Sequence, residues 1–439
     1  MTSVLLPWQP TSADRFDLRK AGHLLRRAGY GGSLSERRDL VRGGVEAAVA
    51  KVFSDGATAT DQGEQWLDAA FAFAEIARVR EFRIWLALSG RRPLQQRMSA
   101  FWHGHFATSN KKVQDPRAML RQFATFDRLG LAAFLELAQA MVRDPALLRW
   151  LDNDSNGKDH PNENFAREWF ELFTLGEGNY QEPDVREAAA AFTGYHVANG
   201  EFVMVGREHD RREKTILGQR GAFTGDDVVR ISIAEPCSAR FLATKWLRFF
   251  VHPEPEAAWI EELQQCYVQG GRNIGTTVRT LLCSQLFFSP QAYRSKVKSP
   301  AELLLGAVRA CGASVAPKLL GAELVNLGEA WGEPPTVEGF HGERAWLSPA
   351  TWLLRSNTLG QLFLGQLGAF SPSPADLLAR TEKPAARVQQ AIDLLLDGEA
   401  SPQSRARLLF FANSPMVQGP DGAAALLHAT ANLPEFHLL

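Results

Sequence analysis

The run from Asp152 to Glu163, DNDSNGKDHPNE, carries the strongest chemical signal in this sequence. It fits the pattern of the EF-hand calcium loop, D-x-[DN]-x-[DN]-G-x5-E, in which regularly spaced oxygen atoms surround the ion and a glycine makes the sharp turn. The run therefore predicts a site for a divalent cation, either Ca²⁺ or a transition metal. Its expected ligands are the side chains of Asp152, Asp154, Asn156 and Glu163 and the backbone carbonyl of Lys158.

Two features of this run oppose a true EF-hand. Asp159 stands where that motif has an apolar residue, and the sequence contains no second hand with which the first could pair. Pro161 would disturb the helix that leaves the loop unless it lies in the first helical turn. The alternative is a loop rich in Asp and Asn that binds no ion and caps the next helix.

A second group of polar side chains lies on an expected helix at 162–175, NENFAREWFELFTL. Helical spacing places Glu168 and Glu171 side by side, so both carboxylates can reach one metal ion or one substrate proton. Either can serve as general base or metal ligand. Arg167 could hold a carboxylate by two parallel hydrogen bonds, and Asn164 offers a neutral hydrogen-bonding group. The alternative is an ordinary solvated face whose ion pairs contribute less than about 1 kcal/mol.

Two histidines, His103 and His105, flank Gly104. In a helix such residues point to nearly opposite sides and cannot bind one ion, whereas at a helix end or in an extended stretch both can face one way. We expect His103 to act as a catalytic acid or a ligand, and His105 to bind a metal. The alternative is that each imidazole is buried and hydrogen-bonded within the core.

Further residues are candidates for substrate binding. His196 follows Thr193-Gly194, an expected helix stop, and should project from a loop. Aromatic residues around the Pro334-Pro335 loop could line a groove. The substrate-binding candidates are Asn162, His196, Lys214 and Trp346.

Motifs of other enzyme classes are absent from the sequence. It has no G-x-x-x-x-G-K-[ST] phosphate loop, no G-x-S-x-G nucleophile elbow, no glycine pattern for dinucleotides and no H-E-x-x-H zinc motif. Hydrolysis is therefore the default reaction for a site made of His and carboxylates. The substrate, a small molecule or a polymer, does not follow from the residues.

Hydrophobic spacing indicates which elements must position these groups. The helical period recurs along most of the chain, including a helix expected at 63–90, and gives way to short β-like runs at 202–205 and 214–217. The sequence thus predicts a mainly α protein, a multi-helix globular array with a small β-hairpin insert. Its regions, which share one continuous core, are an N-terminal helical region (1–150), a polar motif region with the insert (151–235) and a C-terminal helical region (236–439).

Composition excludes several classes of function. The chain of 439 residues has 48 Lys+Arg against 49 Asp+Glu, so no strong net charge draws it to nucleic acid. No apolar run reaches the length of about 18 residues that indicates a membrane helix. The first residues lack an evident export signal, so we expect a cytoplasmic location. The 4 cysteines form no C-x-x-C pair, which excludes a zinc knuckle.

Several motifs together carry a resemblance to a known family. They are NENFAREWFELFTLG from Asn162, HLLRRAGYG from His23, FWHGHFATS from Phe101 and PPTVEGFHG from Pro334. With them the sequence resembles the bacterial domain-of-unknown-function family 1800 over most of its length. The resemblance implies a large helical protein, often exported and often encoded beside a sulfatase-like partner, and it implies no particular activity. This sequence departs from the family in lacking an export signal and in having Gly339-Phe-His where Gly-Trp is usual.

These observations favour a metal-dependent enzyme, hydrolytic by default, with a pocket of His and carboxylate side chains around the start of the helix at 162–171. Such an enzyme would act on a substrate and would bind neither nucleic acid nor membrane. The alternative is a non-catalytic binding or assembly protein in which the loop at 152–163 holds a structural divalent cation.

Overall fold

Capping residues in the sequence set where many helices begin. Helix α1 (Leu18–Arg27) starts after Asp17, whose carboxylate accepts a hydrogen bond from the Lys20 amide. Helices α2 (Leu34–Phe53) and α16 (Pro300–Ala310) start with capping boxes, in which a serine and a glutamate each accept a hydrogen bond from the other's backbone amide. These local signals explain why helices form where the sequence predicts them.

The computed structural model describes residues 3–54, 75–340, 342–378 and 383–439. After α1 and α2, the helices of the N-terminal region are α4 (Ile76–Ser89), α5 (Pro93–His105), α6 (Asn110–Val113), α7 (Pro116–Leu129), α8 (Phe134–Met141) and α9 (Pro145–Trp150). The middle region contains the 3-10 turn η1 (Asn153–Ser155), α10 (Glu163–Glu168), the π-helical turn η2 (Trp169–Thr174), α11 (Glu182–Ala191) and the strands β1 (Tyr195–Ala198), β2 (Glu201–Met204), β3 (Lys214–Ile216) and β4 (Gln219–Gly221).

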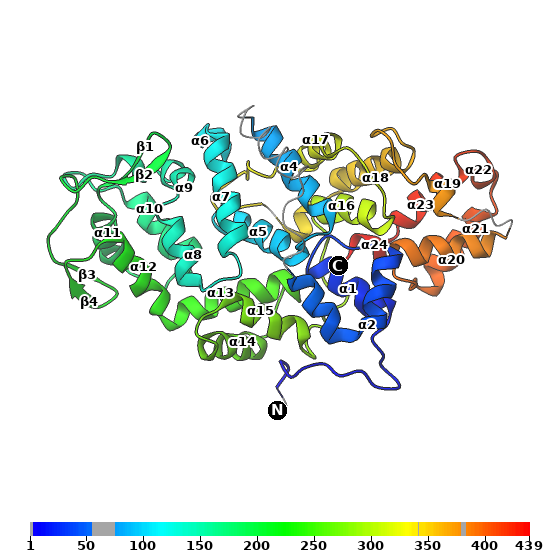
Figure 1. Cartoon of the computed structure of the whole chain (residues 1–439), viewed down its shortest axis with the longest axis horizontal. Helices are drawn as coiled ribbons and strands as arrows, with labels where there is room; N and C mark the ends of the chain where they lie inside the picture. Colours follow the sequence, from blue (N-terminus) through cyan, green and yellow to red (C-terminus); the bar gives the residue numbers. More distant parts are fainter. Residues whose placement is uncertain (1–2, 55–74, 341, 379–382) are drawn as a thin grey trace.

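The remainder of the described chain is helical apart from its loops. Its elements besides α16 are α12 (Gly225–Ala234), α13 (Pro236–Phe250), α14 (Ala257–Gln269), α15 (Ile274–Cys283), α17 (Pro317–Asn326), the 3-10 turn η3 (Glu343–Leu347), α18 (Pro349–Phe363), α19 (Pro374–Leu377), α20 (Pro384–Leu395), α21 (Pro402–Ala412), α22 (Pro415–Gln418), α23 (Gly422–Ala431) and α24 (Pro434–His437). The mainly α fold class is therefore confirmed. Figure 1 shows the elongated array, with α10 to α12 at one end and α20 to α22 at the other.

The two β-like runs do not pair with each other. Each forms one strand of its own antiparallel hairpin, because β1 pairs with β2 and β3 pairs with β4. The turns are Asn199-Gly200 and Leu217-Gly218, in which all four residues have positive φ (52°, 76°, 47° and 77°). Two-residue turns of this left-handed type close tight hairpins. The small insert is thus two hairpins, and each run folds back on its immediate neighbour.

An aromatic column holds α5 against the π-helical turn. Trp102 stacks on Phe106 and on Phe134, and Phe106 stacks on Trp169 with 6.4 Å between ring centroids. All four rings are fully buried. Removing a ring of this size from water stabilises a fold by roughly 2–3 kcal/mol, so this column fixes the histidines of α5 relative to the carboxylates of the neighbouring helix.

One contiguous hydrophobic core runs from Leu5 to Phe436 and takes side chains from all three predicted regions. Helix α23, with the residues GAAALLHATA, is buried along most of its length. Such a helix lacks the polar face that gives an amphipathic period. Of the helix expected at 63–90, the part from Ile76 onward is α4, and its first part lies outside the described residues.

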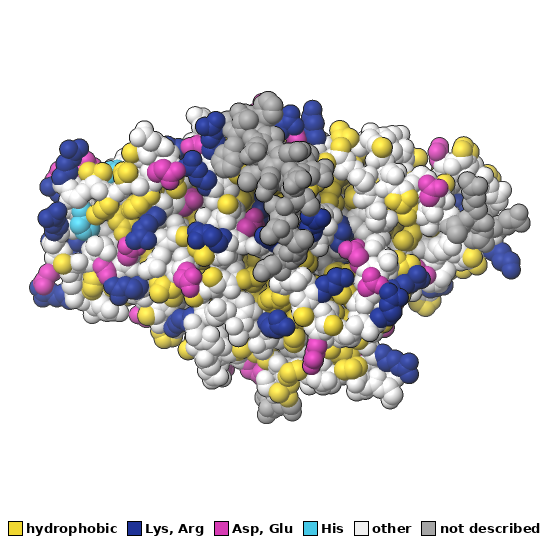
Figure 2. Space-filling view, viewed as in Figure 1, with side chains coloured by type: hydrophobic (Ala, Val, Ile, Leu, Met, Phe, Trp, Pro, Cys, Tyr) yellow, Lys and Arg dark blue, Asp and Glu magenta, His cyan; other side chains and the backbone are white. Residues whose placement is uncertain are grey.

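The surface fits the balanced composition of the chain. On the face seen in Figure 2, basic and acidic side chains are interspersed, as a net charge of −1 would suggest. In the described part of the chain, no helix combines the length and the apolar character needed to cross a bilayer.

Candidate functional site

Asparagine side chains hold the loop at 152–163 in place. Asn156 is fully buried, and its Oδ1 accepts a hydrogen bond from the Asn162 amide (2.9 Å) while its Nδ2 donates to a carbonyl of α11 (3.0 Å). Asn162 caps α10, because its Oδ1 accepts a hydrogen bond from the Asn164 amide. Asn164 Nδ2 in turn donates to the Leu151 carbonyl. The loop therefore fixes where α10 begins, next to the end of α11.

Two further cation ligands predicted in this loop, Asp152 and Glu163, contact basic side chains. Asp152 lies 2.7 Å from Lys112 Nζ, and Glu163 lies 3.3 Å from a nitrogen of Arg167. Within residues 3–54, 75–340, 342–378 and 383–439, no group of three or more His, Cys, Asp and Glu side chains is arranged to hold a metal ion. The cation site stays a prediction. The contacts support the alternative, a loop that caps a helix.

Arg167 binds a carboxylate outside the predicted pair. Its two terminal nitrogens donate to the two oxygens of Glu182 at 2.7 and 2.8 Å. The hydrogen bonds from Arg167 lower the pKa of the Glu182 carboxyl. This fork joins α10 to the start of α11, so Arg167 positions the helix on which Glu168 and Glu171 stand.

Glu168 and Glu171 form a partly buried carboxylate pair, as their spacing predicts. Burial raises the pKa of Glu168 above its usual value, and the charges of Glu171 and Glu338 raise it further. Tyr180 Oη donates a hydrogen bond to Glu171 Oε2 at 2.6 Å. Burial and this hydrogen bond raise the pKa of Tyr180 to about 12. The two carboxyl groups of the pair therefore differ. The pKa of Glu168 is raised, whereas Glu171 is oriented by the hydroxyl group of Tyr180.

Glu338 comes from a loop that the sequence analysis did not connect with this pair. The loop lies directly on α5, because a Cβ atom at Gly339 would come within 2.6 Å of the Gly104 carbonyl oxygen. Gly339 also has a φ of +99°, which disfavours any other residue there. This close approach brings the Glu338 charge near Glu168 and places the loop across the end of α5.

The carboxylate pair stands where α10 passes into the π-helical turn η2. In that turn the amides of Leu175 and Gly176 both donate to the Phe170 carbonyl, at 2.8 and 3.0 Å. Single π-helical turns occur frequently at functional sites, and they free backbone groups for other partners. Here the Leu172 carbonyl accepts a hydrogen bond from Lys245 Nζ of α13 at 3.0 Å.

Lys245 and His105 form a hydrogen-bonded pair behind this turn. His105 Nε2 lies 3.0 Å from the Phe173 carbonyl, so this nitrogen carries the proton, and Nδ1 accepts a hydrogen bond from Lys245 Nζ at 3.1 Å. Burial lowers the pKa of His105 well below its usual value, and burial lowers that of Lys245 to about 7. Sequence reasoning missed Lys245, whose one signal is a lysine beside Trp246 on an apolar helix.

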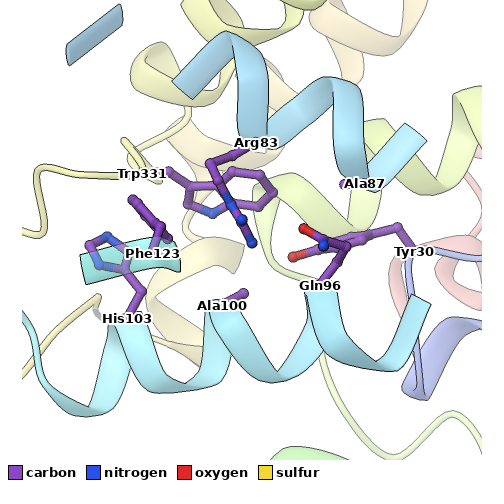
Figure 3. A pocket seen from close by; sticks show the side chains of 8 residues that line it. All are labelled: Tyr30, Arg83, Ala87, Gln96, Ala100, His103, Phe123 and Trp331. Atoms are coloured by element: carbon purple, nitrogen blue, oxygen red, sulfur yellow. The ribbon is translucent and has the colours of Figure 1, made fainter. Parts of the chain in front are cut away.

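His103 faces the opposite side of α5, as the helical alternative requires. Its Nε2 accepts a hydrogen bond from the Gly332 amide at 2.9 Å, and its ring lies 4.7 Å from that of Phe123. Burial lowers the pKa of His103 to about 3, so the imidazole is neutral at physiological pH. It borders a narrow cavity, shown in Figure 3, with Arg83 and Trp331. His103 and His105 therefore do not share one ion.

Two of the substrate-binding candidates are tied into the hairpins. His196 Nδ1 lies 2.5 Å from the Asp154 carbonyl oxygen, and its Nε2 lies 2.8 Å from Glu208. Lys214 is 1% exposed, and its Nζ donates to the carbonyls of Asp210 (2.5 Å) and Arg212 (3.0 Å). Both side chains therefore stabilise the turns between the loop at 152–163 and the two hairpins.

Trp346, the last substrate-binding candidate, contacts the start of the C-terminal helices. It belongs to the 3-10 turn before α18, and its carbonyl lies 3.4 Å from a nitrogen of Arg355. Figure 1 shows α18 and α10 in opposite halves of the molecule. The structure thus brings together Glu168, Glu171, Glu338 and Tyr180 as one group and Lys245 with His105 as another.

Comparison with models of protein families gives one match that covers nearly the whole chain. The model described as "Protein of unknown function (DUF1800)" matches residues 23–438, which is nearly the whole chain. Comparisons with curated proteins and with solved structures gave no match. The resemblance carried by the motifs at His23, Phe101, Asn162 and Pro334 is thereby confirmed, and the chain belongs to the DUF1800 family.

Proposed function

We propose that this protein is an enzyme that carries out acid–base chemistry at Glu168 and Glu171. One observation supports the proposal most strongly: Glu168 is partly buried beside Glu171 and Glu338, which together raise its pKa. A carboxyl group whose pKa is raised is a better proton donor for a reaction than a carboxyl group that ionises at its usual pH. Perturbed carboxyl groups are also more common at functional sites than elsewhere.

Each residue near the pair has a distinct role in this proposal. Glu168 donates a proton to the leaving group, and Glu171, oriented by Tyr180, accepts a proton from water. Arg167 acts through Glu182, since the ion pair between them holds α10 in position. A proton donor beside a proton acceptor supports hydrolysis, and a divalent cation bound at these carboxylates would add a Lewis acid.

Substitutions of the pair test the proposal. The variants Glu168→Gln and Glu171→Gln are compared with Glu177→Gln, which changes an exposed carboxylate nearby in the chain. The assay uses chromogenic esters, glycosides, phosphates and sulfates, first with EDTA and then with Ca²⁺, Mn²⁺ or Zn²⁺. We expect loss of at least about 100-fold in turnover for the two pair variants, the usual scale for a general acid or base, and none for the control. Turnover that survives both substitutions contradicts the proposal.

The alternative is a non-catalytic binding or assembly protein. It is favoured by apolar side chains on the surface of α18, where Leu353 is 61% exposed and Leu354 45% exposed. Apolar patches on a surface can mark protein contacts, and the partner class implied by the family is a sulfatase-like protein. In that case Glu168→Gln should lower the melting temperature and affect no turnover, whereas Leu353→Ser should weaken complex formation.

A further inference from the structure

A small, partly enclosed chamber lies away from the carboxylate pair, where the first helices meet the last ones. It is bordered by Arg26 of α1, Arg37 of α2, Lys298 before α16, Asp397 after α20 and Phe436 of α24. The chamber is distinct from every site discussed above, and the sequence analysis singled out none of these five residues.

The two arginines share the one carboxylate in this chamber. Arg37 Nη1 donates to Asp397 Oδ1 at 2.6 Å, and Arg26 pairs with the other oxygen of the same group. Asp397 approaches α1 so closely that a Cβ atom at Gly22 would overlap its carboxylate. Two guanidinium groups therefore use both oxygens of Asp397, and no carboxylate of the chamber is left for Lys298.

Lys298 is the unpaired cation of the chamber. Its side chain is 3% exposed, and Nζ lies 3.8 Å above the ring of Phe436. Among the described residues, Nζ has no hydrogen-bond or ion-pair partner. Two hydrogen bonds hold the backbone of this residue in place, since the Lys298 amide donates to the His437 carbonyl (2.9 Å) and its own carbonyl accepts from Arg355 (2.8 Å). A buried ammonium group without a partner costs several kcal/mol.

We propose that this chamber binds a small inorganic anion of chloride size, held by Lys298 within the positive field of Arg26 and Arg37. When Lys298 is protonated, three cationic side chains border the chamber against the single carboxylate of Asp397, and this excess of positive charge attracts an anion. The free space, about 20 Å³, is little more than a single water molecule requires. It therefore admits a monatomic ion and excludes a metabolite.

Binding of an anion should be accompanied by protonation of the Lys298 amine. Burial lowers the pKa of Lys298 well below its usual value, so the empty chamber favours the neutral amine. The charged and titratable groups that face this amine are Arg26, Arg37, Arg294, Asp397, Glu302 and His437. An anion favours the charged amine, so the chloride affinity should increase as the pH falls toward 6 from above.

Thermal unfolding at constant ionic strength tests the proposal. Sodium gluconate is replaced stepwise by sodium chloride for the full chain and for Lys298→Met, with Lys318→Met as an exposed lysine control. We expect the melting temperature of the full chain and of the control to rise with the logarithm of the chloride concentration above Kd, by about 3 °C at one hundred times Kd. Lys298→Met should melt at one temperature in both salts. A melting temperature of the full chain that does not depend on chloride overturns the proposal.

Crystals of the unaltered chain grown in sodium bromide give a second readout that needs no variant. An anomalous bromide peak beside Lys298 Nζ supports the proposal, and a chamber without bromide overturns it. Sodium phosphate serves as the size control. Phosphate should not compete with chloride, and competition would contradict a chamber of monatomic size.

Discussion

The surroundings of Glu168 disfavour the ionised form of its carboxyl group. Burial and two neighbouring carboxylates raise its pKa, so the folded state keeps this proton at a pH where the unfolded chain has lost it. The stability contribution therefore falls as the pH rises through the usual glutamate range and stays low above the folded pKa. Stability lost in this way at a functional group is common in enzymes.

Glu168→Gln should remove this dependence on pH. The variant should match the original protein near pH 4, where Glu168 is protonated, and should exceed it at pH 7 by less than about 1 kcal/mol because the site is partly solvated. Urea unfolding at both pH values measures the difference. A variant that is less stable at pH 7 would indicate a structural role for Glu168.

Lys245→Met tests the lysine behind the π-helical turn. The change leaves His105 Nδ1 and the Leu172 carbonyl without their donor, which should cost about 1–3 kcal/mol. Because the pKa of Lys245 is lowered from 10.5 to about 7, the unfolded chain binds the extra proton between these values. Stability from this group therefore rises from pH 7 to pH 10.5, and the variant should lack that rise. Equilibrium unfolding across this range measures both effects.

The loop at 152–163 matches the residue pattern of a calcium-binding loop, yet its asparagine side chains form hydrogen bonds within the protein. Its Asp and Asn residues fit the spacing of a calcium loop, but the same residue types satisfy backbone amides at helix starts. In the structure the side-chain amide of Asn156 makes hydrogen bonds to the backbone of Ala189 and Asn162. A pattern of residue types cannot tell these uses apart, because the partners of Asn156 come from α11 and depend on tertiary packing.

The helices could be predicted because the residues that start them, such as Ser33 with Glu36, lie close together in the sequence. The pairing of Glu168 with Glu171 also follows from helical spacing. Helical spacing does not predict that Glu338 and Lys245 approach this helix. Each comes from a segment far away in the sequence, and no local pattern indicates the contact. The same holds for Lys214, whose burial depends on the 210–214 turn.

Asn156→Ala should disrupt the loop. The change removes a fully buried amide and leaves the Asn162 amide and an α11 carbonyl unpaired, at a cost of about 2–4 kcal/mol. Asp159→Ala, an exposed change in the same loop, should stay within about 0.5 kcal/mol of the original. Chemical denaturation of both variants makes the comparison, and equal stability would show that the loop does not depend on Asn156.

Removal of divalent cations should leave the loop intact. Asp152, Asn156 and Glu163 already contact protein groups, so EDTA should shift the melting temperature by less than about 1 °C, and added Ca²⁺ should not restore or raise it. Differential scanning calorimetry measures this directly. A rise with Ca²⁺ that Asp154→Ala abolishes would instead establish the loop as a cation site.

Over the whole molecule, Arg27 joins segments that are far apart in the sequence. It is fully buried, and its Nη2 donates to the carbonyls of Val251 (3.1 Å), Ala292 (2.6 Å) and Leu439 (3.0 Å). The first helix, the middle of the chain and the last described residue thus meet at one guanidinium group. This junction explains why one core extends through all three predicted regions.

Arg27→Ala should destabilise the entire fold and not a single region. Several buried carbonyls would lose their donor, so we expect a loss of about 3–5 kcal/mol in a single unfolding transition. Arg38→Ala, an exposed arginine of α2, provides the matched control. Two separate transitions in the Arg27→Ala variant would contradict a common core.

The same junction constrains how the protein is made. During synthesis α1 emerges from the ribosome early, yet the carbonyl of Leu439 that its Arg27 binds is separated from it by 412 positions. A nascent chain can order its first helices locally, but it cannot complete their packing until residues 434–439 have left the exit tunnel. Newly made molecules therefore keep an apolar surface of α1 uncovered during this time, and chaperones that recognise such surfaces are expected to associate with them until residues 434–439 have emerged.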